Sequence, residues 1–239
     1  YSCLILPACV YSIMRFRSNM TRSIIIILAT LGTFTATTYI VLMVVIVLIY
    51  FNPFYLIILI PAIYFFYSNV FLDVDRFQLR LRGFSDYFDK GRLDQVRSAT
   101  SLSFLSNFEV AQYTIQKSPI IGSGLGGNEG MYDRYFETDI FRFHYLYGLN
   151  APSAHNLLIR IFSELGLAGG LVYIYLLIKG LILNAPVVYR LISIAALSHF
   201  LCRALKLGGY FDYATPFFVM IMWFNFKEYR MIKNKNKNQ

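Results

Sequence analysis

The residues best suited to chemistry in this chain are one histidine, His155, and two arginines, Arg92 and Arg97. An imidazole can accept or donate a proton near neutral pH, and guanidinium groups bind phosphate oxygens bidentately. These residue types can therefore bind a phosphate-bearing ligand and move a proton beside it. The simpler interpretation is that His155 is structural and that each arginine forms a surface ion pair with Asp89 or Asp94.

The residues after His155 predict an amphipathic helix for which Ser153 is a suitable N-cap. Its apolar stripe consists of Leu157, Leu158, Ile161, Phe162 and Leu165. Its polar stripe, at every fourth position, consists of Asn156, Arg160 and Glu164. We expect this helix to lie at a membrane surface before the glycine-rich residues 166–170 turn the chain into the bilayer. His155 then lies near a helix N-terminus at headgroup height, where anions are favoured.

A glycine-rich segment, residues 118–128, contains the pattern G-x-G-x-x-G at Gly122, Gly124 and Gly127. That pattern binds dinucleotides only within a strand–turn–helix unit. Here no alternation of strands and helices surrounds it, and no helix clearly follows it. We therefore predict a tight turn. It is either purely structural or also presents backbone amides to a substrate phosphate.

The elements that must position these residues follow from the hydropathy pattern. About 50 nearly uncharged residues, 23–72, precede about 80 polar, mixed-charge residues, after which the apolar character returns. A membrane-spanning helix needs roughly 20 apolar residues, and this chain is 57% hydrophobic and only 15% charged. The sequence predicts an all-α integral membrane protein, a multi-pass bundle of transmembrane helices with a large, partly helical extracytoplasmic loop.

We predict four regions along the chain. Residues 1–72 form transmembrane spans whose upstream neighbours are missing, and residues 73–155 form the extracytoplasmic catalytic loop. Residues 156–226 form the interfacial helix and the C-terminal spans, and residues 227–239 form a basic cytoplasmic tail, as the positive-inside rule expects. The expected spans are residues 1–14 (in part), 18–34, 37–51, 54–72, 166–184, 187–206 and 212–226. One long tilted helix over residues 18–51 is the alternative to two short passes.

The predicted loop carries nine basic and ten acidic side chains, so it does not favour nucleic acid despite the net charge of +9 for the chain. Part of it predicts a helix that ends near Lys117, just before Pro119, because apolar side chains recur at helical spacing. These side chains are Phe104, Phe108, Ala111 and Ile115. The cysteines Cys3, Cys9 and Cys202 all lie in apolar segments. Because carboxylates and histidines are not clustered either, the sequence predicts no metal site.

The order of the polar motifs resembles the O-antigen ligase and polymerase family, which includes the Wzy-type enzymes that polymerise lipid-linked sugar repeats. The motifs are Arg92, then Pro119-x-x-Gly122-x-Gly124, then His155-Asn156, then Glu164-Leu-Gly166-x-x-Gly169 at the start of a membrane span. The resemblance covers roughly residues 20–185. It does not separate a polymerase from a ligase.

The resemblance implies a bacterial plasma-membrane glycosyltransferase that is active on the extracytoplasmic face. Such an enzyme polymerises polyprenyl-diphosphate-linked oligosaccharides into O-antigen, capsular or exopolysaccharide, without a nucleotide sugar, metal or cofactor. A hydroxyl of one lipid-linked glycan attacks the anomeric carbon of another and expels the carrier (undecaprenyl) diphosphate. The implied partners are the lipid-linked donor and acceptor and the bilayer, with a flippase and a chain-length regulator of the same pathway as further candidates.

The resemblance also implies roles for individual residues. His155 and Arg92 are the implied catalytic residues, with His155 as general base or as the group that orients the acceptor hydroxyl. The implied substrate-binding residues are Arg97, Asn156, Arg160, Arg203, Gly122 and Gly124. The arginines among them are expected to stabilise charge that develops on the leaving diphosphate.

One departure from the family pattern concerns residues 33–38, TFTATT, where many members carry a Ser-Arg pair. The missing arginine leaves a phosphate contact to be supplied elsewhere, for which Arg203 is the candidate. This substitution favours a polymerase over a ligase. Arg203 shares a helical face with His199 and Lys206 near the outer end of a predicted span, where such residues are functional or snorkel to lipid phosphates.

Two other functions remain open. The first is a ligase of the same fold, which transfers the finished glycan to a lipid or protein acceptor. The second, more distant, is a transporter whose loop acts as a gate. A transporter predicts ionisable residues within the spans near the bilayer midplane, and the predicted spans are almost free of them.

Overall fold

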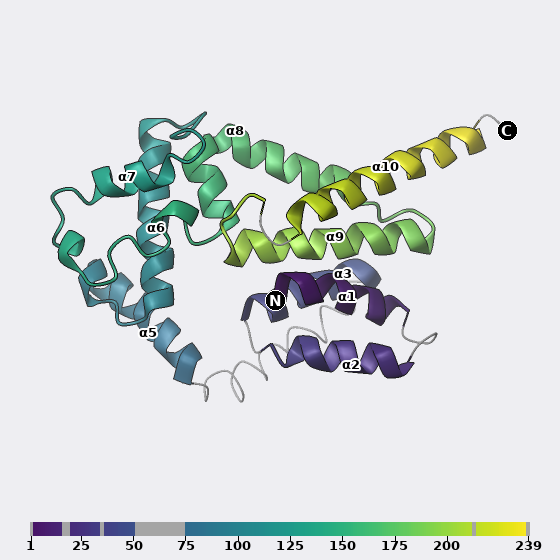
Figure 1. Ribbon diagram of the computed structural model, residues 1–239, viewed down its shortest axis with the longest axis horizontal. Coiled ribbons are helices and arrows are strands. Elements are labelled where there is room, and N and C mark those ends of the chain that lie inside the picture. The colour runs from purple at the N-terminus through teal and green to yellow at the C-terminus, as the bar shows by residue number, and fades with distance from the viewer. Residues whose placement is uncertain (1, 16–19, 34–35, 51–74, 212–213, 238–239) are drawn as a thin grey trace. The chain divides into compact units, whose positions relative to one another are not determined.

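The fold is all-helical throughout the part of the chain that the computed structural model describes, residues 2–15, 20–33, 36–50, 75–211 and 214–237 (Figure 1). This confirms the predicted α-helical class. Two helices, α8 (Leu157–Gly180) and α9 (Val187–Lys206), are long and apolar enough to cross a membrane. The multi-pass bundle stays a prediction, and the expected span at residues 54–72 lies outside the described residues.

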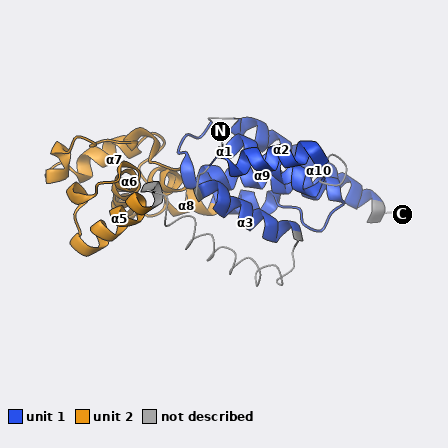
Figure 2. Ribbon diagram, turned by 90° about the horizontal axis from the view of Figure 1, so that it is seen from below, with its two compact units in different colours: residues 1–55, 172–239 blue, residues 56–171 orange. Residues whose placement is uncertain are grey.

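The chain divides into two compact units (Figure 2). The first consists of Tyr1–Tyr55 together with Val172–Gln239, and the second of Leu56–Leu171. The second unit contains the predicted loop and also the first part of α8. It contains His155 and most of the other candidate site residues.

The first unit packs short apolar helices against α9. Helix α1 (Ser2–Met14) contacts α9 and α2 (Met20–Leu31), and α3 (Ala36–Tyr50) packs against α9 and α1. Their common core is aliphatic and includes Leu6, Val10, Val41, Val45 and Ile194. Helices α2 and α3 are separate, so one long helix over residues 18–51 is wrong. With 12 and 15 residues, each is shorter than the roughly 20 residues of a membrane span.

Helix α10 (Thr215–Lys237) extends beyond the predicted span at residues 212–226. It continues through the basic residues to Lys237, and the basic cytoplasmic tail stays a prediction. Those residues are rich in Lys, Arg, Glu and Met, which are good helix formers, and they contain no Gly or Pro. Charge therefore ends the apolar stretch without ending the helix.

The second unit is built around α6 (Ala99–Lys117), which contacts α5 (Asp75–Lys90) and α7 (Asn128–Tyr135). The predicted helix ending near Lys117 is thereby confirmed. A core of aliphatic and aromatic side chains fills the space beside α6, and its ring pairs meet edge to face or tilted. It includes Leu102, Val110, Tyr132, Phe136 and Phe141.

Helix α7 also corrects a prediction, because it starts directly after Gly127 where no helix was expected. Its eight residues have no clear amphipathic pattern and include Gly130. The helix is fixed by two fully buried side chains, Asn128 and Tyr132, rather than by an apolar stripe. The described residues contain no strand, so the glycine pattern still does not form a dinucleotide-binding unit.

Helix α8 breaks at Gly166, which has the non-helical backbone angles φ 63° and ψ −160°. The break lies where we expected the interfacial helix to give way to a span. The predicted N-cap is wrong: Ser153 belongs to the 3₁₀ turn η5 (Ala151–Ser153). The cap is Asn156, whose Oδ1 accepts a hydrogen bond from the Ile159 backbone N–H at 2.8 Å.

Candidate functional site

His155 lies in a short segment whose backbone is strained. Asn150, Ala154 and His155 all have left-handed conformations, with φ values of 62°, 51° and 63°. Such a conformation is uncommon for residues other than glycine and costs roughly 1–2 kcal/mol per residue. It persists only where surrounding contacts over-determine it.

The contacts that hold this segment come from Ser103 on α6. The Ser103 hydroxyl oxygen lies 3.0 Å from His155 Nδ1, accepts a hydrogen bond from Asn150 Nδ2 at 2.8 Å and donates to the Leu149 carbonyl at 3.2 Å. Ser103 is itself buried. One hydroxyl thus ties the imidazole to the chain that precedes it.

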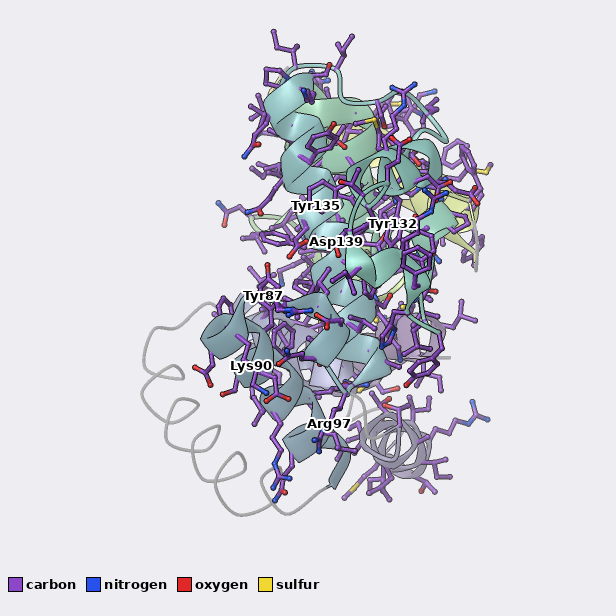
Figure 3. The ribbon with its side chains drawn as sticks, turned by 90° about the vertical axis from the view of Figure 1, so that its left-hand side faces the viewer. Tyr87, Lys90, Arg97, Tyr132, Tyr135 and Asp139 are labelled. Carbon is purple, nitrogen blue, oxygen red and sulfur yellow. The ribbon has the colours of Figure 1, made fainter. Side chains whose placement is uncertain are left out.

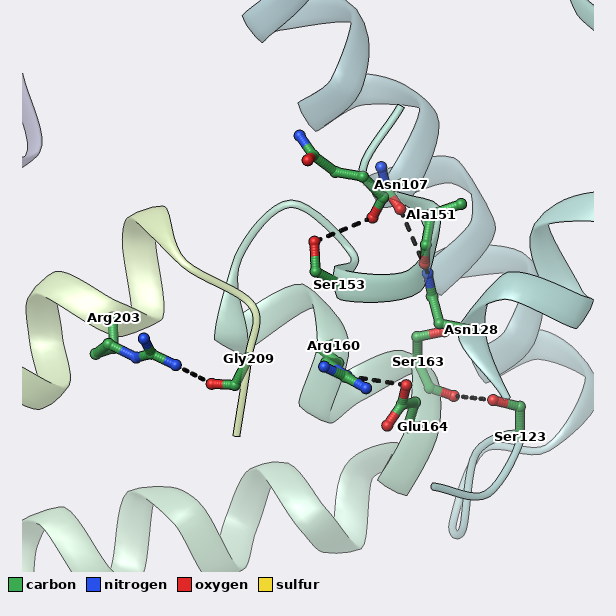
Figure 4. Close-up of polar contacts among 11 residues, drawn as sticks. Asn107, Ser123, Asn128, Ala151, Ser153, Arg160, Ser163, Glu164, Arg203 and Gly209 are labelled. Carbon is green, nitrogen blue, oxygen red and sulfur yellow. Dashed lines mark hydrogen bonds and ion pairs between the residues drawn. The ribbon is translucent and has the colours of Figure 1, made fainter. Parts of the chain in front are cut away.

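Two buried asparagines extend this network. Asn107, one turn after Ser103 on α6, donates from Nδ2 to the Leu149 carbonyl at 3.3 Å. Asn128 donates from Nδ2 to the Ala151 carbonyl at 2.6 Å and to Asn107 Oδ1 at 3.3 Å (Figure 4). Both side chains are fully buried, so these bonds take the place of bonds to water for the two Nδ2 groups and for Asn107 Oδ1. The polar network fixes residues 149–151 against α6.

The electrostatics of His155 favour the neutral imidazole. Burial, and then the charge of Arg80, lower its pKa to about 4. The ring also meets the edge of Phe104 at 5.8 Å between centroids. His155 is therefore uncharged at pH 7 and able to accept a proton.

Arg80 was missed in the sequence. It lies on α5, and its carbonyl accepts a hydrogen bond from Ser101 Oγ at 3.1 Å, which ties this turn of α5 to α6. A signal was available, since Arg76, Arg80 and Arg82 are concentrated in the first half of this helix. Nothing local to α5 indicates that the charge of Arg80 acts on His155, which follows 75 residues later.

Arg92 and Arg97 have different surroundings, and neither is among the described contacts of His155. Arg92 forms a bidentate pair with Asp94, at 3.0 and 2.9 Å, and its side chain is 52% exposed. This is the surface ion pair that was the simpler interpretation. Arg97 lines a pocket of about 540 Å³ together with Arg82 and Lys90; Figure 3 labels Lys90 and Arg97. Among the described contacts, none joins Arg92 or Arg97 to His155.

Asn156 and Arg160 have structural partners. Besides capping α8, Asn156 is 4% exposed, so its amide is enclosed by the fold. Arg160 Nε binds Glu164 Oε1 at 3.0 Å, one turn along α8 (Figure 4). Glu164 is fully buried, and a buried carboxylate needs such a partner.

Gly122 and Gly124 hold a tight turn, and their amides are already used. The Gly122 N–H bonds the Ser118 carbonyl at 3.0 Å, and the Gly124 N–H bonds the Glu164 carbonyl at 2.9 Å. A side chain at Gly122 would lie 2.7 Å from the Gly166 nitrogen. The expectation that these two amides contact a phosphate is therefore wrong, and close packing explains the glycine at position 122.

Arg203 belongs to the first unit. It is fully buried near the end of α9 and donates from Nη2 to the Gly209 carbonyl (Figure 4). His199, one turn earlier, lies 2.8 Å from the Cys3 carbonyl and 3.2 Å from Thr215 Oγ1, and stacks on Phe218. These contacts fix α9 within its own unit.

A second group of titratable side chains joins three elements of the second unit. Glu109 on α6 accepts a hydrogen bond from the Tyr87 hydroxyl of α5 and contacts Tyr135 of α7, near Asp139 (Figure 3). Burial raises the pKa of Glu109; the hydrogen bonds from Tyr87 and Tyr135 offset part of this rise, and the charge of Asp139 adds to it. Burial also raises the pKa of Tyr135, to about 12. The described residues contain no group of three or more His, Cys, Asp or Glu arranged to hold a metal.

No family model, curated protein or solved structure matches this chain. The motif-based resemblance to the O-antigen ligase and polymerase family thus stays an expectation. Function must therefore be inferred from the geometry around His155.

Proposed function

We propose that this chain belongs to a membrane glycosyltransferase that polymerises polyprenyl-diphosphate-linked oligosaccharides. The observation that carries the proposal is a neutral imidazole, His155, fixed in a strained backbone between Ser103 and the charge of Arg80. Strain and a perturbed pKa are found together mostly where a site is organised for chemistry.

The hydrogen bonds around Ser103 support one tautomer of His155. The Ser103 hydroxyl has a single proton, which the Leu149 carbonyl accepts, and its lone pairs remain for donors. Nδ1 of His155 then carries the proton and donates it to Ser103 Oγ. Nε2 is left as the acceptor, as in other sites where a second group orients a catalytic imidazole.

In the proposed reaction, the acceptor hydroxyl donates its proton toward His155 Nε2. Its oxygen forms a bond to the anomeric carbon of the donor while the bond from that carbon to the diphosphate oxygen breaks. Arg80 is the proposed group that stabilises the charge left on the diphosphate, in place of Arg92. Because a bound diphosphate offsets the charge of Arg80, it also raises the pKa of His155 toward a value suited to a general base.

The proposed location is the extracytoplasmic face of a bacterial plasma membrane. Support comes from α8 and α9, which are long and apolar enough to span, and from the position of His155 directly before α8. The proposed partners are the lipid-linked donor and acceptor. Arg97, with Arg82 and Lys90 in the pocket of about 540 Å³, is a further candidate for contact with the glycan.

The test is complementation of a strain that lacks the full-length gene. We expect His155→Ala and Arg80→Gln to abolish long polysaccharide chains, while Arg92→Gln retains them. Matched controls are His144→Ala and Arg134→Gln, which change the same residue types elsewhere in the second unit. Normal chain lengths with both His155→Ala and Arg80→Gln would show that the site is assigned wrongly.

The same strain separates a polymerase from a ligase. Loss of a polymerase leaves single repeats attached to the acceptor, whereas loss of a ligase removes all attached glycan. We expect single repeats. If all attached glycan is lost, the protein is a ligase and not a polymerase, and the proposed roles of His155 and Arg80 stay the same.

A further inference from the structure

The turn that follows α6 carries large apolar side chains that point away from the protein. Ile120, Ile121 and Leu125 are 67%, 70% and 74% exposed. Such side chains are usually scattered on a protein surface. Here they occupy one short segment that contains no charged residue between Lys117 and Glu129.

Backbone hydrogen bonds hold this turn rigidly against the break in α8. Ser123 and Gly124 donate to the carbonyls of Ser163 and Glu164, both at 2.9 Å. In the other direction, the carbonyl of Pro119 accepts from Leu167 at 2.9 Å.

The hydrogen bonds from α8 to the turn cap the helical segment that starts after Gly166. Leu167 and Ala168 begin the helical segment after the break, so their N–H groups have no partner within that segment. The carbonyls of Pro119 and Ile120 accept them, at 2.9 and 3.1 Å. The turn is therefore held in place by α8, and its apolar side chains remain exposed instead of packing onto the core.

The exposed surface of the turn continues onto α8. Leu167 and Leu171, just after the break, are 48% and 68% exposed. They belong to α8, which over its full 24 residues, including the break at Gly166, is long and apolar enough to cross a membrane. On the other side of the turn, Lys117 lies 5.6 Å from the ring centroid of Tyr113. Tyrosine and lysine are typical of the membrane–water interface.

We propose that residues 119–125 form an apolar wedge that inserts into the acyl–headgroup boundary of the membrane, with lipid as its partner. This inference rests on the membrane location given under the proposed function. Because Ser123 and Gly124 are bonded to the first segment of α8, the depth of the wedge sets the height of that segment. It thereby sets the height of His155 above the lipid.

The test uses the full-length protein in lipid bilayer discs with a polarity-sensitive fluorophore at single introduced cysteines. Ile121→Cys and Leu125→Cys probe the wedge. Ile140→Cys, at a position 65% exposed in the same unit, is the matched control, and Ile178→Cys, at a position 68% exposed on α8, reports the span. The parent protein, whose Cys3, Cys9 and Cys202 are buried, is labelled in parallel as the blank.

We expect the labels at positions 121, 125 and 178 to report lipid and the label at position 140 to report water. If positions 121 and 125 report water while position 178 reports lipid, the wedge is wrong and the membrane location stands. If position 178 also reports water, the membrane location fails and the wedge fails with it. A signal at position 121 that appears only with two protein copies per disc would assign the surface to self-association and overturn the wedge.

Discussion

Two half-buried titratable residues of the second unit, His155 and Glu109, differ in the direction of their pKa shift and in their backbone conformation. Burial lowers the pKa of His155 and raises the pKa of Glu109, so both are driven toward the neutral form. His155 lies in a left-handed segment, whereas Glu109 lies within the regular helix α6. Glu109 has tyrosine partners on α5 and α7.

This difference distinguishes the candidate site at His155 from the group around Glu109, which we call the joint because it links α5, α6 and α7. The Glu109 group costs no backbone strain and joins three helices, as expected of a contact that stabilises the fold. The segment of His155 costs strain at Asn150, Ala154 and His155, and a polar network is needed to maintain it. Strain that stability does not require is a mark of function. The predictions that follow test this separation.

The largest expected effect is loss of activity without loss of stability in His155→Gly. Removing a general base lowers the rate by about 10²–10⁴-fold. Glycine adopts φ 63° without strain, which offsets the lost hydrogen bond to Ser103 to within about 1 kcal/mol. Polymer synthesis from lipid-linked substrate and thermal unfolding in detergent are the measurements. A large loss of stability would mean that His155 is a structural residue.

A smaller loss of activity is expected for Ser103→Ala, since Ser103 positions His155 without touching substrate. We expect kcat to fall about tenfold while KM stays near its original value, because a misoriented base slows the chemical step. Stability should fall by about 1 kcal/mol, the usual value of a hydrogen bond. Ser106→Ala, on the same helix and also buried, is the matched control. If Ser106→Ala lowers kcat equally, the effect comes from α6 as a whole.

The sequence predicted those parts of the fold that depend on local pattern. The apolar repeat of α6, its end before Pro119 and the break at Gly166 all follow from spacing and residue type within a few turns. Helix α9 begins and ends where expected because its apolar run has clear boundaries. The predicted end of the last span at residue 226 gave no helix boundary, because charge limits an apolar stretch without ending the helix, and α10 continues to Lys237.

The surroundings of the candidate site could not be predicted in the same way. His155 could be chosen from its position before an amphipathic helix, but its partners Arg80 and Ser103 come from helices 75 and 52 residues away. Serine and asparagine on α6 carry no signal of their own, because the same residues serve as surface or turn residues elsewhere. Their role depends on tertiary packing, which brings residues 149–155 onto α6.

For the joint at Glu109 we expect loss of stability with activity retained. Tyr87→Phe removes the hydroxyl that donates to the carboxylate, and leaves that half-buried acceptor with one partner fewer. The expected cost is about 1–2 kcal/mol in the free energy of unfolding. Chemical unfolding in detergent measures it, with Tyr145→Phe, at an exposed position, as control. If polymer synthesis per folded protein falls tenfold or more, Glu109 belongs to the site after all.

The last prediction is a pair of opposite pH dependences, which change stability without changing the sequence. Between pH 4 and 6.5, the unfolded state binds a proton at His155 that the folded state does not. This makes folding more favourable as pH rises, by at most about 3 kcal/mol. Glu109 has the opposite sign: its raised pKa means that the folded state keeps a proton above pH 4.5, so its contribution to stability is lost as pH rises through that window.

His155→Gly should therefore flatten the rise in stability between pH 4 and 6.5, and Glu109→Gln should steepen it. Equal slopes in parent and both variants would show that neither group titrates differently on folding, and the contrast between site and joint would then rest on backbone strain alone.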